Sequence, residues 1–158
     1  MDVSKFLKRV QADDFYSGQI AHRHVIPVRR PRYGKLDDPL PERLASVLKR
    51  SGVEKLYIHQ IEAVEALRKG RDVVLVTSTA SGKTLCYNIP VLESLIKDPE
   101  SRALYLFPTK ALAQDQLRVL NRYGGEGGLR FEAGTYDGDT PTSLRRKLRD
   151  EAKALLTN

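Results

Sequence analysis

Residues 77–84 have the sequence Thr-Ser-Thr-Ala-Ser-Gly-Lys-Thr and directly follow an apolar run at 72–76. A strand, a tight loop and a helix in this order can cradle phosphate, because backbone N–H groups and the positive helix end face the anion. Gly82 would let the backbone approach closely, Lys83 would reach the β- and γ-phosphates, and Thr84 would offer its hydroxyl to Mg²⁺. The sequence therefore predicts a site for a nucleoside triphosphate with Mg²⁺.

The general phosphate-loop pattern, G-x-x-x-x-G-K-[ST], has glycine at the position that Thr77 takes here. A bare Gly-Lys-Thr can occur by chance. In this chain it stands between a β-branched run and a long helical pattern, so chance is the weaker interpretation. The predicted site also includes the loop residues Thr79, Ala80 and Ser81.

A second group of candidate residues precedes the loop, at Tyr57 and Gln60. A glutamine amide can pair its donor and its acceptor with the edge of adenine, and a tyrosine ring can stack on the base. The alternative is a surface glutamine at the start of a helix, which the residue type by itself favours. If the first interpretation holds, the nucleotide is ATP.

Two polar segments follow the later apolar runs, at 108–114 and 135–141. In the first, a strand ends in Pro-Thr and a helix begins, which presents a hydroxyl and early helix N–H groups to a nucleic-acid backbone. The second presents small polar groups, and its alternative is an ordinary Asp-Gly turn. The predicted nucleic-acid-binding residues are Pro108, Thr109, Lys110, Gln114, Asp137, Gly138 and Thr140.

The elements that would position these residues alternate along the chain. Two helices come first, over 42–50 and 58–69. Then the pattern predicts strand 72–76, helix 83–97, strand 102–107, helix 109–123, strand 129–135, helix 144–152 and strand 154–157. Such alternation with continuously apolar strands indicates an α/β fold, in which a parallel sheet has helices on both faces. Ligands of such sheets bind at the carboxyl ends of the strands, where the phosphate loop would lie.

The 158-residue chain is 41% hydrophobic and carries a net charge of +7, which favours an anionic partner. Residues 22–35 hold five Arg or Lys and no acid, and suit a solvated arm as well as a nucleic-acid contact. We divide the chain into an irregular, basic extension at 1–36 and a nucleotide-binding domain at 37–158. The one cysteine, Cys86, excludes an internal disulfide, no run has the ~18 apolar residues of a membrane span, and we expect a cytoplasmic protein.

Four ordered segments resemble the first RecA-like domain of superfamily 2 DEAD/DEAH-box helicases. The region of Gln60 is similar to the adenine-reading Q motif, 77–84 to motif I, 107–114 to motif Ia and 136–140 to the motif Ib region. The strings at 56–60, 79–88, 102–116 and 135–141 resemble the mitomycin-repair-factor and Hrq-type branch, in which Thr77 and Ala80 are expected variants. The resemblance implies an ATP- and Mg²⁺-dependent helicase that moves 3′-to-5′ on DNA, single-stranded or at a duplex junction, without sequence preference, in DNA repair.

The resemblance also implies parts that these residues do not supply. Motif II would add an apolar strand ending in Asp-Glu, and a second RecA-like domain would add an arginine. Asp150 and Glu151 end a charged helix, so we interpret them as solvent-facing, and no complete catalytic set is present. We expect the N-terminal part of a helicase that is a poor ATPase by itself; the alternatives are a binding module without turnover and an NTPase of another phosphate-loop class.

Overall fold

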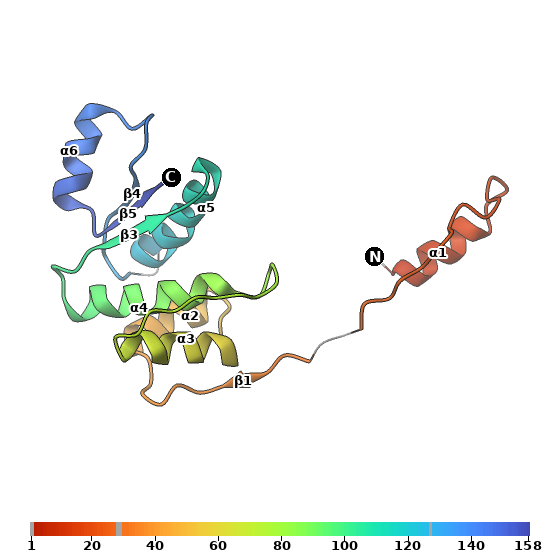
Figure 1. Ribbon diagram of the computed structural model, residues 1–158, viewed down its shortest axis with the longest axis horizontal. Helices are drawn as coiled ribbons and strands as arrows, with labels where there is room; N and C mark the ends of the chain where they lie inside the picture. Colours follow the sequence, from red (N-terminus) through yellow and green to blue (C-terminus); the bar gives the residue numbers. More distant parts are fainter. Residues whose placement is uncertain (1, 28–29, 127) are drawn as a thin grey trace. The chain divides into compact units, whose positions relative to one another are not determined.

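The computed structural model describes residues 2–27, 30–126 and 128–158, and it separates the chain into two compact units, 1–31 and 32–158 (Figure 1). The first unit contains helix α1 (Val3–Gln11). The side chain of Asp2 caps this helix by accepting hydrogen bonds from the N–H groups of Ser4 and Lys5, at 3.0 and 3.2 Å. Of the basic arm predicted at 22–35, Val28 and Arg29 lie outside the described residues.

The second unit contains the remaining elements (Figure 1). Its helices are α2 (Glu42–Arg50), α3 (Ile58–Arg68), α4 (Lys83–Lys97), α5 (Lys110–Asn121) and α6 (Thr142–Glu151), with the π-helical turn η1 (Arg122–Glu126) after α5. Its strands are β1 (Tyr33–Gly34), β2 (Leu56–Tyr57), β3 (Ala103–Leu106), β4 (Ala133–Thr135) and β5 (Ala154–Thr157). No helix in the described part of the chain is both long and apolar enough to cross a membrane.

The main sheet has the strand order β3-β5-β4, and both strand pairs are parallel. The last strand of the chain therefore lies between the two earlier ones, with Leu156 opposite both Tyr105 and Thr135. Helices α5 and α6 lie on opposite sides of this sheet (Figure 1). The predicted α/β fold with a parallel, doubly covered sheet is confirmed.

The strand predicted at 72–76 is wrong, because the structure assigns no strand there and the segment is not part of the sheet. Val74 and Val76 are 89% and 90% exposed. An extended segment becomes a strand only when its backbone groups pair with a neighbour. The apolar sequence that suggested a buried strand has no such neighbour among the described residues. The helix that follows it, α4, is confirmed over 83–97.

The third predicted strand is shorter than expected, since β4 begins only at Ala133. Two preceding residues instead bond back to the turn after α5: the N–H of Leu129 donates to the carbonyl of Tyr123, and the N–H of Arg130 donates to that of Gly124. Arg130 has a φ of 56°, a left-handed conformation that interrupts an extended strand.

The core joins helices α2, α3, α4 and α5 to the main sheet. The sequence places Leu44, Val47 and Leu48 on one face of α2, and the structure buries all three. They cluster with residues of α3, α4, α5 and the sheet: Val64, Ile89, Leu92, Tyr105, Leu120 and Leu156. This packing fixes α2, α3 and α4 relative to the sheet, and hence the loops that connect them.

Helices α3 and α4 are also joined by a partly buried ion pair. The guanidinium of Arg68 meets the carboxylate of Glu93 through two hydrogen bonds, of 3.1 and 2.5 Å. The nearby acids, Glu93 first, raise the pKa of Arg68 above its usual range. A two-point contact of this kind fixes orientation as well as distance. It holds the helix that carries Gln60 against the helix that follows the phosphate loop.

Candidate functional site

The loop at 77–82 leads directly into α4 and turns through two left-handed residues. Gly82, the residue before the helix, has a φ of 77°, and Ala80 has a φ of 57°. A Cβ atom at Gly82 would lie 2.6 Å from Nε2 of Gln60. Glycine is therefore required there both for its backbone conformation and for this close approach.

Polar contacts within the loop bring together the groups that we expect to meet phosphate. Nζ of Lys83 donates to the carbonyls of Thr77 and Ser78, at 3.0 and 2.6 Å. The hydroxyls of Thr77 and Ser81 are 2.7 Å apart. These bonds are exposed, so a phosphate group could replace them with stronger charge-assisted ones. Thr79 and Ala80 lie at the exposed tip of this loop.

Gln60 is only 1% exposed, so the interpretation of it as a surface residue is wrong. Its Oε1 accepts a hydrogen bond from the N–H of Tyr57 at 2.9 Å, and its Nε2 donates to the carbonyl of Gly82 at 2.9 Å. Each half of the amide keeps one further hydrogen-bonding position, since the NH₂ has a second hydrogen and the oxygen a second lone pair. Gln60 therefore ties α3 to the phosphate loop and lines a pocket beside it, and its contact with a base stays a prediction.

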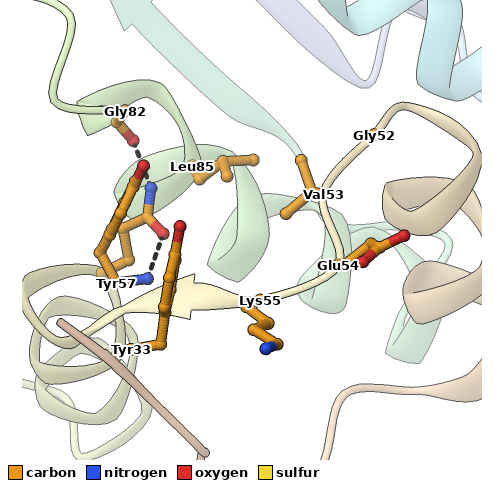
Figure 2. Close-up of a pocket in the computed structure, with 9 residues that line it drawn as sticks. Tyr33, Gly52, Val53, Glu54, Lys55, Tyr57, Gly82 and Leu85 are labelled. Carbon is orange, nitrogen blue, oxygen red and sulfur yellow. Dashed lines mark hydrogen bonds between the residues drawn. The ribbon is translucent and has the colours of Figure 1, made fainter. Parts of the chain in front are cut away.

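A pocket of about 490 Å³ lies beside these residues (Figure 2). The ring of Tyr33 stacks on that of Tyr57, with centroids 5.0 Å apart, because β1 and β2 place the two residues directly opposite each other. Sequence reasoning missed Tyr33, since only the pairing of two-residue strands brings it here. The pocket is lined by Tyr33, Gly52, Val53, Glu54, Lys55, Tyr57, Gln60, Gly82 and Leu85.

The predicted Mg²⁺ site rests on Thr84, whose hydroxyl lies 3.4 Å from that of Tyr87. In the described ranges no cluster of three His, Cys, Asp or Glu side chains could bind a metal ion. Mg²⁺ often keeps several waters and binds through one or two protein groups plus substrate phosphates. The single Thr84 hydroxyl fits a Mg²⁺ ion that arrives with a nucleotide.

Asp150 and Glu151 are exposed at the end of α6, as the sequence predicts. The guanidinium of Arg102, which precedes β3, donates to the carbonyl of Asp150 at 2.9 Å. This contact lies at the amino ends of the strands, whereas α5 begins at the carboxyl end of β3. These two acids and the predicted nucleic-acid segments therefore lie at opposite ends of the strands.

The two predicted nucleic-acid segments lie together at the carboxyl ends of β3 and β4. Thr109 caps α5 by accepting from the N–H of Leu112 at 3.3 Å, and Pro108, just before it, is exposed. Gln114 donates to the hydroxyl of Thr135 at 3.1 Å. Lys110 pairs with Asp139, an exposed contact that raises the pKa of Lys110 and lowers that of Asp139.

The segment 136–141 contains the Asp-Gly turn that its sequence offers as an alternative, with the side chain of Asp137 bonded inside the turn. Oδ1 of Asp137 accepts from the N–H of Asp139 at 2.8 Å, and the hydroxyl of Thr140 accepts from the N–H of Asp137 at 2.9 Å. Thr140 is only 9% exposed, so its side chain closes the turn, while Gly138 lies exposed at the tip. Contact of these residues with nucleic acid stays a prediction.

Arg145 of α6 holds this turn through its backbone carbonyls, a role that sequence reasoning missed. Its guanidinium donates to the carbonyls of Thr140, Asp137 and Gly138, at 2.8, 2.9 and 3.2 Å. It also lies over the ring of Tyr136, 5.4 Å from the centroid. In sequence, Arg145 is one of several basic residues on a charged helix, and only the fold distinguishes it from its neighbours.

Comparison with known protein families shows to which family a chain with this loop, pocket and turn belongs. Residues 57–158 match the family model described as DEAD/DEAH box helicase. The chain belongs to this helicase family. The match begins at Tyr57 and extends through the phosphate loop and the turn that Arg145 holds.

Two curated relatives and one solved structure place the chain more closely. It is 45% identical to the uncharacterized ATP-dependent helicase YprA of Bacillus subtilis over 88% of this chain and 19% of that protein. It is 37% identical to the ATP-dependent helicase hrq1 of Schizosaccharomyces pombe over 99% of this chain and 15% of that protein. The crystal structure of the DUF1998 helicase MrfA bound to DNA and AMPPNP matches 98% of this chain and 21% of its own, with a TM-score of 0.85 and 40% identity.

These comparisons confirm the predicted resemblance to the Hrq-type and mitomycin-repair-factor helicases. The chain spans about a fifth or less of the length of these relatives. It corresponds to the N-terminal part of their helicase domain, the part that carries the phosphate loop.

Proposed function

We propose that this chain binds ATP with Mg²⁺ and forms the N-terminal part of the motor of a DNA helicase. The pocket that Tyr33, Tyr57 and Gln60 line is here called the nucleobase pocket. The observation that carries the proposal is the hydrogen bond between Gln60 and Gly82, which joins this pocket to the phosphate loop. The base would lie in the pocket near Tyr57, and the triphosphate would lie along the loop toward Lys83. Thr84 would give one oxygen to the Mg²⁺ that the phosphates bring.

Single-stranded DNA, or the single strand at a duplex junction, would lie across the carboxyl ends of β3 and β4. Its backbone would meet the exposed Thr109, Lys110, Gln114 and Gly138, which makes the contact independent of sequence. MrfA has been crystallised with DNA and AMPPNP, and this supports DNA as the partner. In the whole protein, ATP hydrolysis would drive 3′-to-5′ movement on DNA, with a role in repair.

The chain by itself should bind ATP but hydrolyse it poorly. The acids Asp150 and Glu151 lie at the amino ends of the strands, whereas the predicted DNA contacts lie at the carboxyl ends. We therefore assign neither acid to catalysis. Phosphoryl transfer depends on positioned charge, and a transition-state arginine alone contributes about 10³–10⁵ in rate. DNA-stimulated turnover by residues 1–158 at about 1 per second or more would contradict this part of the proposal.

Nucleotide titration of the 158-residue chain tests the ATP site. Lys83→Ala should weaken ATP binding about 10- to 100-fold, because it removes a charge-assisted contact to phosphate. Lys97→Ala is the matched control, since it removes the same charge from the other end of α4. Equal affinities for the two variants would refute the assignment of the phosphate loop.

Titration with fluorescent single-stranded DNA tests the second site. Lys110→Ala should weaken binding and lower the salt dependence by about 0.7 in the log–log slope, the value for one lost phosphate contact. Lys49→Ala, an exposed lysine on α2, is the control. DNA binding that ignores salt, or that Lys110→Ala and Lys49→Ala change equally, would remove the proposed DNA surface.

A further inference from the structure

Two neighbouring residues of α3 contact two neighbouring carbonyls of the phosphate loop. Nε2 of His59 lies 3.0 Å from the carbonyl oxygen of Ser81, and Nε2 of Gln60 donates to that of Gly82. A carbonyl oxygen only accepts hydrogen bonds, so Nε2 of His59 must carry the hydrogen. Both the neutral ring with this tautomer and the imidazolium can make the bond.

These contacts set the direction of the loop's N–H groups. In a trans peptide unit, the carbonyl of one residue and the N–H of the next point in opposite directions. Turning the Ser81 carbonyl toward α3 therefore aims the N–H of Gly82 away from α3. The Gly82 carbonyl likewise aims the N–H of Lys83. These are N–H groups of the kind that bind phosphate in such loops.

We propose that His59 is a positioning residue for the phosphate loop: it holds the Ser81 carbonyl so that the Gly82 N–H is presented to the triphosphate. This inference rests on the proposed ATP site. It assigns to His59 a role distinct from base recognition, because the residue contacts the loop backbone and is not among those that line the nucleobase pocket.

Ring stacking holds the side chain of His59 in place. It stacks on the ring of Tyr57, with centroids 5.6 Å apart and an angle of 11° between the planes. Tyr57 in turn stacks on Tyr33, which β1 places opposite it. The row of three rings runs from β1 to the loop, and its last member makes the bond to Ser81. The donor is therefore fixed before nucleotide binds, which lowers the cost of ordering the loop.

Three substitutions separate the donor from the ring. His59→Phe keeps a ring for stacking and removes the donor. His59→Gln removes the ring and keeps an N–H donor at about the reach of Nε2, whereas His59→Asn keeps an amide that reaches only about as far as Nδ1. The affinities to measure are those for ATP, GTP and inorganic tripolyphosphate, in the 158-residue chain with Mg²⁺.

We expect His59→Phe and His59→Asn to bind all three ligands about 3- to 10-fold more weakly than the unchanged chain, as the loss of one neutral hydrogen bond predicts. His59→Gln should stay within about 2-fold of the unchanged chain. The ratio of ATP to GTP affinity should be the same in every variant, because the contact is to the phosphate loop.

Several outcomes would overturn the inference. Unchanged affinity in His59→Phe would show that the bond does not position the loop, and an equal loss in His59→Gln would assign the effect to ring stacking. A changed ATP-to-GTP ratio would assign His59 to base recognition. If His59→Phe fails to fold, as judged by thermal melting, His59→Asn decides by the same criteria. Failure of the unchanged chain to bind any of the three ligands would instead refute the proposed ATP site.

Discussion

Arg145 offers a sharp test of how the fold prepares the predicted DNA surface. Replacing it with alanine removes three hydrogen bonds from a charged donor to the carbonyls of Asp137, Gly138 and Thr140. It also removes the cation–π contact with Tyr136. Hydrogen bonds with a charged partner contribute about 1.5–3 kcal/mol each. Arg145 is half-buried, so water weakens these bonds, and we expect Arg145→Ala to lower the free energy of unfolding by about 2 kcal/mol in total.

Arg146 provides the matched control, because it is the next residue of α6, carries the same charge and is exposed. Arg146→Ala should change the free energy of unfolding by no more than about 0.5 kcal/mol. Both variants lower the net charge equally. Any difference between them therefore reports the turn that Arg145 holds rather than the loss of a cation.

Urea unfolding and titration with single-stranded DNA are the two measurements. Arg145→Ala should weaken DNA binding about 5- to 30-fold more than Arg146→Ala, because binding must then also order the turn. The log–log salt slopes of the two variants should agree, since an ordering cost releases no counterions. Equal stability and equal DNA affinity of the two variants would refute the argument that Arg145 organises the turn for DNA.

The remaining predictions concern packing, the helix pair and pH. Gly134→Ala should destabilise the chain by about 1–3 kcal/mol, because its Cβ would lie 2.3 Å from Leu148, and adding Leu148→Ala should give a less-than-additive loss in urea unfolding. Arg68→Met should cost about 2–3 kcal/mol by leaving Glu93 partly buried without its partner, and Arg68→Met with Glu93→Met should recover most of this; no recovery would contradict the pairing argument. Burial raises the pKa of Tyr105 far above its ordinary 10.0, so the folded chain keeps a proton that the unfolded chain loses above about pH 10, and the free energy of unfolding should fall as pH rises from there. Urea unfolding between about pH 9 and pH 11 should show a shallower fall for Tyr105→Phe, and an identical fall would contradict this cause.

Much of the fold follows from local sequence pattern. Helix α2 was predicted at its observed bounds, as was α4, and α3 differs by one residue at its end. Apolar residues at helical spacing, with a glycine after α2 and α3, carry this information locally. The strands were less predictable, since a strand depends on a partner elsewhere in the chain. The apolar segment 72–76 shows this most plainly: its sequence resembles a buried strand, and the described sheet does not include it.

In the candidate site, too, a continuous segment could be predicted from the sequence, whereas contacts between distant segments could not. The types and order of residues 77–84 were enough to predict a phosphate loop, because that chemistry belongs to one short, continuous segment. Gln60 was recognised from the resemblance, yet its burial and its bond to Gly82 appear only when α3 packs against α4.

Tyr33, His59 and Arg145 gave no comparable signal, since each acts on a segment that it meets only through the fold. The sequence by itself determined the chemistry that this protein can offer to phosphate. Tertiary structure decided which side chains hold those groups in place, because hydrogen bonds and ring contacts depend on distances that packing alone sets.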